Sequence, residues 1–205
     1  MFKKSLMLLT MVGFVLVLVS CEGEINELSG PVGVAFELPN PDLPAVLIHI
    51  EGHGEIIAEL YPDYAPITVQ NFIDLVEDGF YDGLTFHRII DGFMMQGGCP
   101  YGTGFGGSGT EITGEFSSNG ISNPLLHTRG VLSMARSAPN DSASSQFFII
   151  HGTSPHLDGD YAAFGQVVHG INVVDAVVAS VEPIDNNGTI DEEDHPVIRE
   201  IRIIN

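Results

Sequence analysis

Residues 86–98 read FHRIIDGFMMQGG, and this stretch decides the fold of the chain. The segments 85–89 and 92–96 show an alternating pattern and flank the dipeptide Asp91-Gly92. Alternation with a period of two is typical of β-strands, and an Asp-Gly dipeptide between two such segments is typical of a tight hairpin turn. The stretch therefore predicts a β-hairpin, and it makes an antiparallel sheet the expected framework of the domain.

The hairpin carries one cation among apolar side chains. Three residues come within reach of Arg88 once the two strands pair: Phe93, Met94 and Gln96. An arginine in an apolar strand can instead extend its guanidinium to solvent or pair with a nearby carboxylate. Two more clusters of apolar and polar residues, at 146–148 and 156–159, favour a binding role, because with the hairpin they would form a shallow apolar groove for a peptide.

The rest of the domain follows from the same kind of pattern. Short strand-like segments recur at residues 46–50, 55–60, 131–135, 146–150, 162–168 and 197–204. After the second of these the period changes, because apolar residues recur at i, i+3, i+4 and i+7 from Val69. Helices are therefore predicted over 65–78 and 171–180. Many short strands with only two helices predict a mainly β fold, a closed antiparallel β-barrel.

The chain of 205 residues is strongly acidic, with a formal net charge of −20, and 44% of it is hydrophobic. This size and composition suit one domain with a real core. The basic residues are Lys3, Lys4, Arg88, Arg129, Arg136, Arg199 and Arg202. A surface with so few cations repels phosphate backbones, so nucleic acid is not expected as a partner. Solubility, or tolerance of a saline medium, explains the acidity better than steering of a substrate does.

The amino terminus has the pattern of an export signal. Two lysines precede an apolar run over residues 6–19, which is shorter than the ~20 residues that span a bilayer comfortably. The run ends in Leu-Val-Ser followed by Cys21, which resembles a bacterial lipoprotein box and implies lipid on Cys21. A plain signal peptide or a single-pass anchor is the alternative. We expect a lipoprotein signal peptide over 1–20 and a flexible tether over 21–44.

Several other motif matches are rejected, because the surrounding sequence lacks the elements that each motif requires. The run 102–107 matches the dinucleotide pattern G-x-G-x-x-G, but no helix follows it and no βαβ unit surrounds it, so a surface loop is expected. The acidic stretch 185–194 has its glycine at the wrong position for a calcium loop, which favours a solvated turn. No G-x-S-x-G elbow surrounds the serines at 144–145, which argues against a serine hydrolase. Cys99 is interpreted as a bystander thiol, and no metal site is predicted.

The hairpin and the two other groove clusters resemble those of the cyclophilins, a family of peptidyl-prolyl cis-trans isomerases. The matching stretches are residues 86–98, 130–136, 145–149, 157–159 and 164–165. Their order and spacing match the family across the whole predicted domain, residues 45–205. The resemblance implies an eight-stranded barrel capped by two α-helices, a reaction without a cofactor, and proline-containing polypeptides as substrates.

The resemblance also assigns roles to individual residues. It implies that Arg88 is the catalytic arginine. The pocket for the proline ring would be formed by Phe93, Met94, Phe148 and Leu157. The groove beside that pocket would be lined by Gln96, Ala135 and Gln146, and His87 matches a groove histidine of the family.

At three groove positions the chain departs from the family's pattern. Tyr161 stands where many members carry histidine, and Arg136 stands where many carry asparagine. His156 occupies the position of a tryptophan that contacts cyclosporin in many eukaryotic members. We therefore predict that cyclosporin binds weakly while isomerase activity persists; tight, stoichiometric inhibition in a titration would contradict this.

The sequence thus predicts an isomerase that accelerates X–Pro rotation in exported proteins during folding. The protein is expected to be a monomer, lipid-anchored to a bacterial cell membrane and facing outside the cytoplasm. The alternative is a proline-peptide-binding chaperone module without significant turnover. The presence of Arg88, Phe93 and Gln96 together favours the isomerase.

Overall fold

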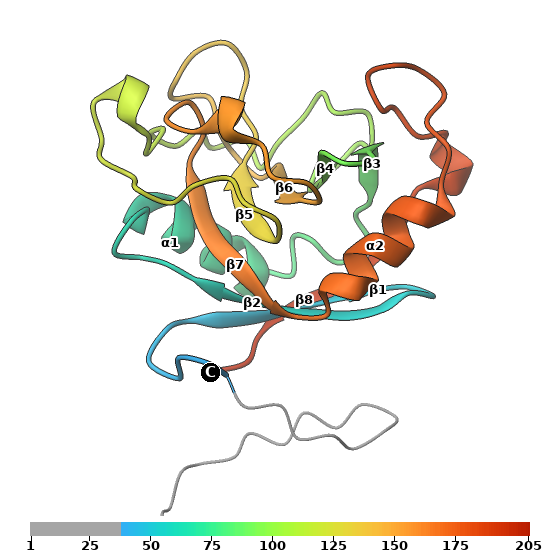
Figure 1. Cartoon of the computed structure of the whole chain (residues 1–205), viewed down its shortest axis with the longest axis horizontal. Helices are drawn as coiled ribbons and strands as arrows, with labels where there is room; N and C mark the ends of the chain where they lie inside the picture. The colour runs from blue at the N-terminus through green and yellow to red at the C-terminus, as the bar shows by residue number, and fades with distance from the viewer. Residues whose placement is uncertain (1–37) are drawn as a thin grey trace, which may run out of the picture. The chain divides into compact units, whose positions relative to one another are not determined.

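The computed structural model describes residues 38–205, which form one eight-stranded antiparallel sheet with two α-helices (Figure 1). The strands are β1 (Ala45–Ile50), β2 (Gly54–Leu60), β3 (Phe86–Ile90), β4 (Met94–Gly97), β5 (Val131–Met134), β6 (Phe147–Ile150), β7 (Ala163–His169) and β8 (Ile198–Ile203). The helices are α1 (Pro66–Glu77) and α2 (Ile171–Ser180), and the short 3-10 turns are η1 (Ser117–Asn119), η2 (Pro155–Leu157) and η3 (Glu192–Asp194). Each strand and α-helix overlaps a segment where the sequence predicts one, with ends that differ by a few residues.

The sheet curls on itself, with the strand order β3-β4-β6-β5-β7-β2-β1-β8. Its two edge strands meet only near their first residues, where Thr85 and Val197 form an isolated bridge and the N–H of Ile198 donates to the carbonyl oxygen of Leu84 at 2.7 Å. Farther along, β3 bonds to the segment 188–190 instead of to β8. The predicted closure of the barrel is therefore overstated: the sheet is a half-barrel, because that segment covers the outer edge of β3.

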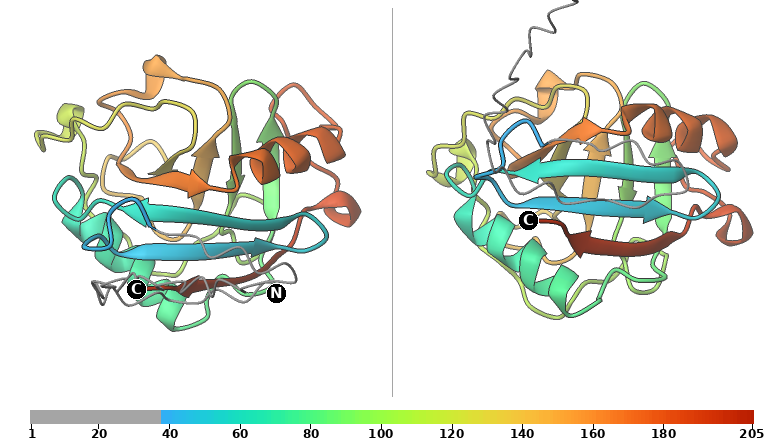
Figure 2. Two further views of the ribbon diagram at one scale, coloured as in Figure 1. Left: turned by 60° about the horizontal axis from the view of Figure 1, so that its bottom comes forward. Right: turned by 90° about the horizontal axis from the view of Figure 1, so that it is seen from below.

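An aromatic cluster fills the inside of the curled sheet. The ring of Phe72 on α1 lies 5.1 Å from those of Tyr81 and Phe164 and 5.3 Å from that of Phe147. All four rings are fully buried, and rings of this size dominate the energetics of a core. The buried residues of α1 follow the helical spacing predicted from the sequence. α1 and α2 pack against the same core, at opposite ends of the curled sheet (Figure 2).

A buried carboxylate from a distant loop completes the amino end of α1. Ala65 precedes the helix and has no side chain that could cap it. Glu115 accepts hydrogen bonds from the backbone N–H groups of Ile67 at 3.1 Å and Thr68 at 2.7 Å, and from the Thr68 hydroxyl at 2.7 Å. A negative charge at this end of a helix is favourable, because the unpaired N–H groups there carry partial positive charge. The loop that carries Glu115 is thereby fixed to the core.

The end of the predicted tether is bonded to the domain. The N–H of Asn40 donates to Glu59 at 2.7 Å, and the side chain of Asn205 donates to the carbonyl oxygen of Leu43 at 2.6 Å. The leader over 1–20, Cys21 and most of the tether lie outside the described residues. Within residues 38–205 no helix has the length and apolar character that crossing a membrane requires.

Candidate active site

The hairpin of β3 and β4 is slightly longer at its tip than a two-residue turn. Arg88 pairs with Gln96 and Ile90 pairs with Met94, which leaves Asp91, Gly92 and Phe93 as the loop. Gly92 has a φ of 70°, a conformation that glycine adopts without strain. Phe93 therefore lies in the turn instead of on the strand, and its ring is presented beside the pair formed by Arg88 and Gln96.

Arg88 is half-buried and is held by neutral groups. Its Nε donates to the carbonyl oxygen of Asn187 at 2.7 Å, and its Nη1 donates to the side-chain oxygen of Gln96 at 3.2 Å. The guanidinium carbon lies 6.0 Å from the centre of the Phe93 ring, and Nη1 lies 3.9 Å from the sulfur of Met94. Burial lowers the pKa of Arg88, yet an arginine remains a cation at neutral pH. The three predicted neighbours are thus confirmed.

A tight turn after α2 fixes the position of Arg88. The carboxylate of Asp185 accepts hydrogen bonds from the N–H groups of Asn187 at 2.9 Å and Thr189 at 3.0 Å, and from the Thr189 hydroxyl at 2.8 Å. These bonds lower the pKa of Asp185. Gly188 has a φ of 86°, and a Cβ there would lie 2.8 Å from the carbonyl oxygen of Ile89. The acidic stretch begins with a turn, as the sequence predicts, but no local pattern indicates that this turn packs against Arg88.

A cavity of about 160 Å³ lies beside Arg88, and we call it the Phe148 cavity. Its lining residues are Arg88, Phe93, Met94, Gln96, Ala135, Arg136, Phe148, Leu157 and Tyr161. The side chains of Met94, Phe148 and Leu157 are buried and make an apolar floor. The structure thus brings together nine of the groove residues that the resemblance implies.

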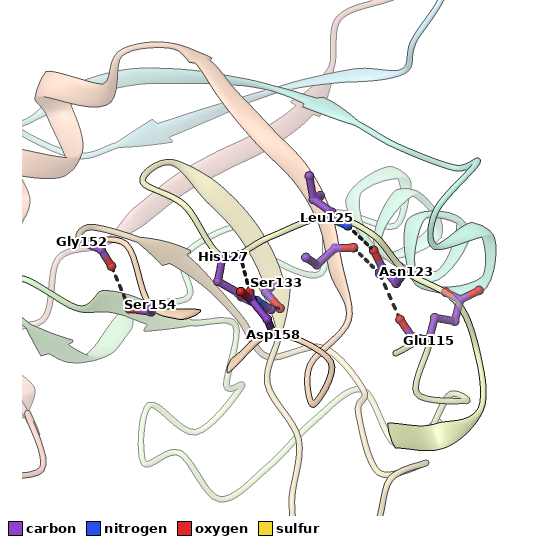
Figure 3. Close-up of polar contacts among 9 residues, drawn as sticks. Glu115, Asn123, Leu125, His127, Ser133, Gly152, Ser154 and Asp158 are labelled. Atoms are coloured by element: carbon purple, nitrogen blue, oxygen red, sulfur yellow. Dashed lines mark hydrogen bonds and ion pairs between the residues drawn. The ribbon is translucent and has the colours of Figure 1, made fainter. Parts of the chain in front are cut away.

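A buried polar network backs the floor of this cavity (Figure 3). Nδ1 of His127 lies 2.9 Å from the Asp158 carboxylate, and Nε2 lies 2.9 Å from the hydroxyl of Ser133. The His127 ring stacks on Phe148 with centroids 6.2 Å apart. Burial lowers the pKa of His127, against the bond to Asp158, so the ring is neutral at pH 7.

The order Ser, His, Asp is that of a nucleophilic triad, but this one cannot attack a ligand. Ser133 is 0% exposed and is not among the residues that line the described cavities near Arg88. The backbone N–H of His127 also donates to Asp158 at 2.8 Å, which ties the chain before β5 to the end of η2. The network therefore positions Phe148 and Leu157.

A second cavity of about 520 Å³ adjoins the first, and we call it the Gln146 cavity. Gln96, Ala135 and Arg136 line both cavities. The remaining walls are the glycine-rich loop 104–111, the segment 137–144 and Gln146. The Gln146 side chain donates to the carbonyl oxygens of Gly104 at 2.8 Å and Gly106 at 2.7 Å, and it accepts from Gln96 at 2.9 Å. Gln146 therefore joins the hairpin to the loop.

Arg136 stands on the wall between the two cavities. Its guanidinium carbon lies 5.0 Å from the centre of the Phe116 ring and 4.9 Å from that of Tyr161. Its Nε donates to the backbone carbonyl oxygen of Asp160 at 2.9 Å. His156 is exposed at the rim, where its ring lies 5.3 Å from that of Phe93. Weak binding of cyclosporin stays a prediction, which rests on the resemblance that places His156 at the tryptophan position.

His87 departs from the expected groove position. It neighbours Arg88 on β3, so its side chain points to the other face of the strand, and it lines neither cavity. The residue is 5% exposed, and within the described residues neither ring nitrogen has a hydrogen-bond partner. Burial, with smaller contributions from His195 and Arg88, lowers the pKa of His87 to about 4. His87 is a neutral residue beneath the loop at Gly104.

Cys99 is a buried free thiol.

Comparison with known proteins agrees with this geometry. A family model described as cyclophilin type peptidyl-prolyl cis-trans isomerase/CLD matches residues 45–205. Peptidyl-prolyl cis-trans isomerase B of Bacillus subtilis is 52% identical over 122 residues, covering 60% of this chain and 82% of that protein. A peptidyl-prolyl cis-trans isomerase of Synechococcus elongatus is 52% identical over 113 residues, covering 55% and 73%. A crystal structure of a Cryptosporidium parvum cyclophilin type isomerase, in the presence of the dipeptide Ala-Pro, has a TM-score of 0.68 and 31% identity, covering 78% of this chain and 98% of that one.

Proposed function

Since the chain belongs to the cyclophilin-type peptidyl-prolyl cis-trans isomerases, we propose that it turns X–Pro bonds of proteins that fold outside the cytoplasm, from a lipid anchor on Cys21. Catalysis of X–Pro isomerisation follows from the family and from the cavity beside Arg88. The anchor and the exported substrates are supported by the sequence of the first 44 residues alone.

The reaction is a rotation in which no covalent bond forms or breaks. Amide resonance sets a barrier of ~18–20 kcal/mol, so an X–Pro bond isomerises unaided in about tens to hundreds of seconds. The apolar floor of Met94, Phe148 and Leu157 suits a proline ring, which carries no N–H that would have to be paired. A ring held there leaves the preceding carbonyl group free to turn.

Arg88 supplies the interaction that strengthens during the rotation. As the amide twists, its nitrogen loses resonance with the carbonyl group and its lone pair becomes a hydrogen-bond acceptor. The Arg88 guanidinium lies at the edge of the cavity, held by Asn187 and Gln96, and donates toward that nitrogen. A donor that is already in place favours the twisted state over both planar states, which is differential binding of the transition state.

The position of Arg88 at the edge of an apolar cavity is the observation that carries the proposed mechanism. The test is exchange spectroscopy on a short proline peptide with the full chain in detergent. We expect substoichiometric protein to speed cis–trans exchange. Peptide signals that shift on binding without faster exchange would instead support the binding module without turnover.

The proposed anchor has its own test. When the chain is made in an exporting bacterium, we expect the mature protein to begin at Cys21 and to carry the mass of attached acyl chains. Cys21→Ser should abolish acylation and leave an unprocessed leader, because the thiol is the acceptor. A mature protein cut elsewhere, without acyl mass, would overturn the anchor but not the isomerase.

A further inference from the structure

Two of the five arginines of the described residues lie at the active site of this acidic protein. The formal net charge is −20, and the described residues contain arginine as their only strongly basic type. Two of these arginines, Arg88 and Arg136, line the Phe148 cavity together. The other three, Arg129, Arg199 and Arg202, lie outside both cavities.

Neither groove arginine has its charge neutralised by the protein. Within residues 38–205, Arg129 pairs with Asp175 at 2.5 Å and Arg202 approaches Glu200 at 4.0 Å, but no ion pair joins Arg88 or Arg136 to a carboxylate. Nε and Nη1 of Arg136 donate to backbone carbonyl oxygens. Its Nη2 makes no hydrogen bond to the described residues, so this nitrogen can donate to a ligand.

Arg136 also occupies the point that a bound peptide must pass. A chain whose proline lies in the Phe148 cavity and whose neighbouring residue enters the Gln146 cavity crosses the wall that both cavities share. Phe116 and Tyr161 flank the guanidinium and hold its plane in place. A fixed guanidinium with one free nitrogen, Nη2, can donate a charge-assisted hydrogen bond to a carboxylate.

We propose that Arg136 makes this isomerase selective for proline peptides that carry an acidic side chain on the residue entering the Gln146 cavity. The proposal rests on the function given above and names its substrate class. A purely structural arginine, stacked to hold the turn at Asp160, would make turnover independent of the charge of the substrate.

Negative charges near Arg136 limit how strongly the site prefers an acidic over a neutral substrate side chain. Glu111 is exposed and lines the Gln146 cavity, and Asp160 adjoins Tyr161 in the chain. Asp185 acts on Arg88, but its oxygens already accept three hydrogen bonds. The remaining acidic surface is screened beyond about 8 Å at physiological salt. We therefore expect a preference of about fivefold, typical of a charge pair that water partly reaches.

The test compares peptide pairs that differ only by Glu against Gln, placed on the amino side of X–Pro in one pair and on the carboxyl side in the other. Both turnover and binding are measured with the full chain at low and high salt. We expect a Glu-to-Gln ratio of kcat/KM near five for one pair, falling toward one in 0.5 M salt. Ratios near one for both pairs would overturn the proposal.

Variants assign the preference to its residue. Arg136→Gln should bring the ratio to about one, whatever it does to the absolute rate, and Arg136→Lys should restore part of it. Arg199→Gln removes the same charge from an exposed site on β8 and should leave the ratio unchanged. A preference that survives Arg136→Gln contradicts the proposal. Absence of turnover on every peptide would contradict the isomerase instead, and the binding ratios would still decide the preference.

Discussion

The two adjoining cavities are built in different ways. The Phe148 cavity takes Arg88, Met94, Gln96 and Phe148 from paired strands, where the register fixes which side chains meet. The Gln146 cavity takes most of its wall from the loop 104–111 and the segment 137–144. The geometry that catalysis needs is thus set by the sheet, while the surface that meets the rest of a substrate can vary without disturbing it.

The largest effect is expected in the Phe148 cavity, from Arg88→Ala. Loss of the donor removes an interaction made in the twisted state, so kcat/KM should fall by about 10²–10³-fold, as for other donors that stabilise a transition state. The fold should persist, because Arg88 is half-buried and its bonds reach surface groups. Isomerase kinetics and circular dichroism check both parts.

Arg199→Ala is the matched control, because it removes an exposed arginine from β8. It should leave the rate within a factor of about two, as expected for a remote surface change. If Arg88→Ala keeps near-parental rates, catalysis does not depend on the cation, and the distinction between the two cavities loses its basis.

The second largest effect is expected on stability, from His87, which lies beneath the loop 104–111 that forms a wall of the Gln146 cavity. The folded-state pKa of about 4 lies below the ordinary value of 6.5, so the folded protein resists a proton that the unfolded chain accepts. This contribution is complete above pH 6.5 and is lost as the pH falls from 6.5 to 4. The free energy of unfolding should drop by roughly 3 kcal/mol from this group over that range.

Urea unfolding at pH 7 and pH 4.5, for the parent and for His87→Phe, isolates this contribution. Phenylalanine does not titrate and suits a site with no hydrogen-bond partner, so the variant should lose less stability on acidification than the parent does. His53→Asn, in the turn between β1 and β2, should behave like the parent. Identical pH dependence in the parent and His87→Phe would show that His87 accepts a proton in the fold.

The contrast between the strand-built Phe148 cavity and the loop-built Gln146 cavity also explains which parts of the structure the sequence predicts. The strands, α1, α2 and the pairing of Arg88 with Gln96 follow from periods of two and 3.6, which are local properties. The placement of Glu115 and of the turn at Asp185 does not, because each binds a distant part of the chain: Glu115 caps α1, and the turn at Asp185 binds Arg88 through the carbonyl oxygen of Asn187.

His87 was misplaced for a related reason. Its place beside Arg88 in the motif indicates function, yet neighbouring residues on a strand point to opposite faces. The alternation of faces along a strand already indicates that His87 and Arg88 do not share the groove face. The role of His127 had no signal of this kind, because its contact with Phe148 joins the approach to β5 with β6 through tertiary packing.

A smaller effect is expected behind the Phe148 cavity, from Asp158→Asn. The change weakens the bond to His127, which supports Phe148, so stability should fall by about 2 kcal/mol, as for bonds to a charged group. The looser floor should raise KM several-fold with little change in kcat, because the residue does not touch the reacting bond. Asp63→Asn, an exposed carboxylate before α1, is the control. A fall in kcat alone would contradict a positioning role.

The smallest effect is expected in the loop wall, from Gln146→Ala. The change removes the bonds to Gly104 and Gly106 and one partner of Gln96, so the loop should loosen while Arg88 keeps its bond to Asn187. We expect kcat/KM to fall by about fivefold, the worth of one hydrogen bond, and the amides of the loop to exchange hydrogen faster. Gln166→Ala, on β7, whose side chain donates to the backbone carbonyl oxygen of Arg129, should change neither. A loss as large as that of Arg88→Ala would mean that the loop wall belongs to the catalytic geometry, and the two cavities would then be one site.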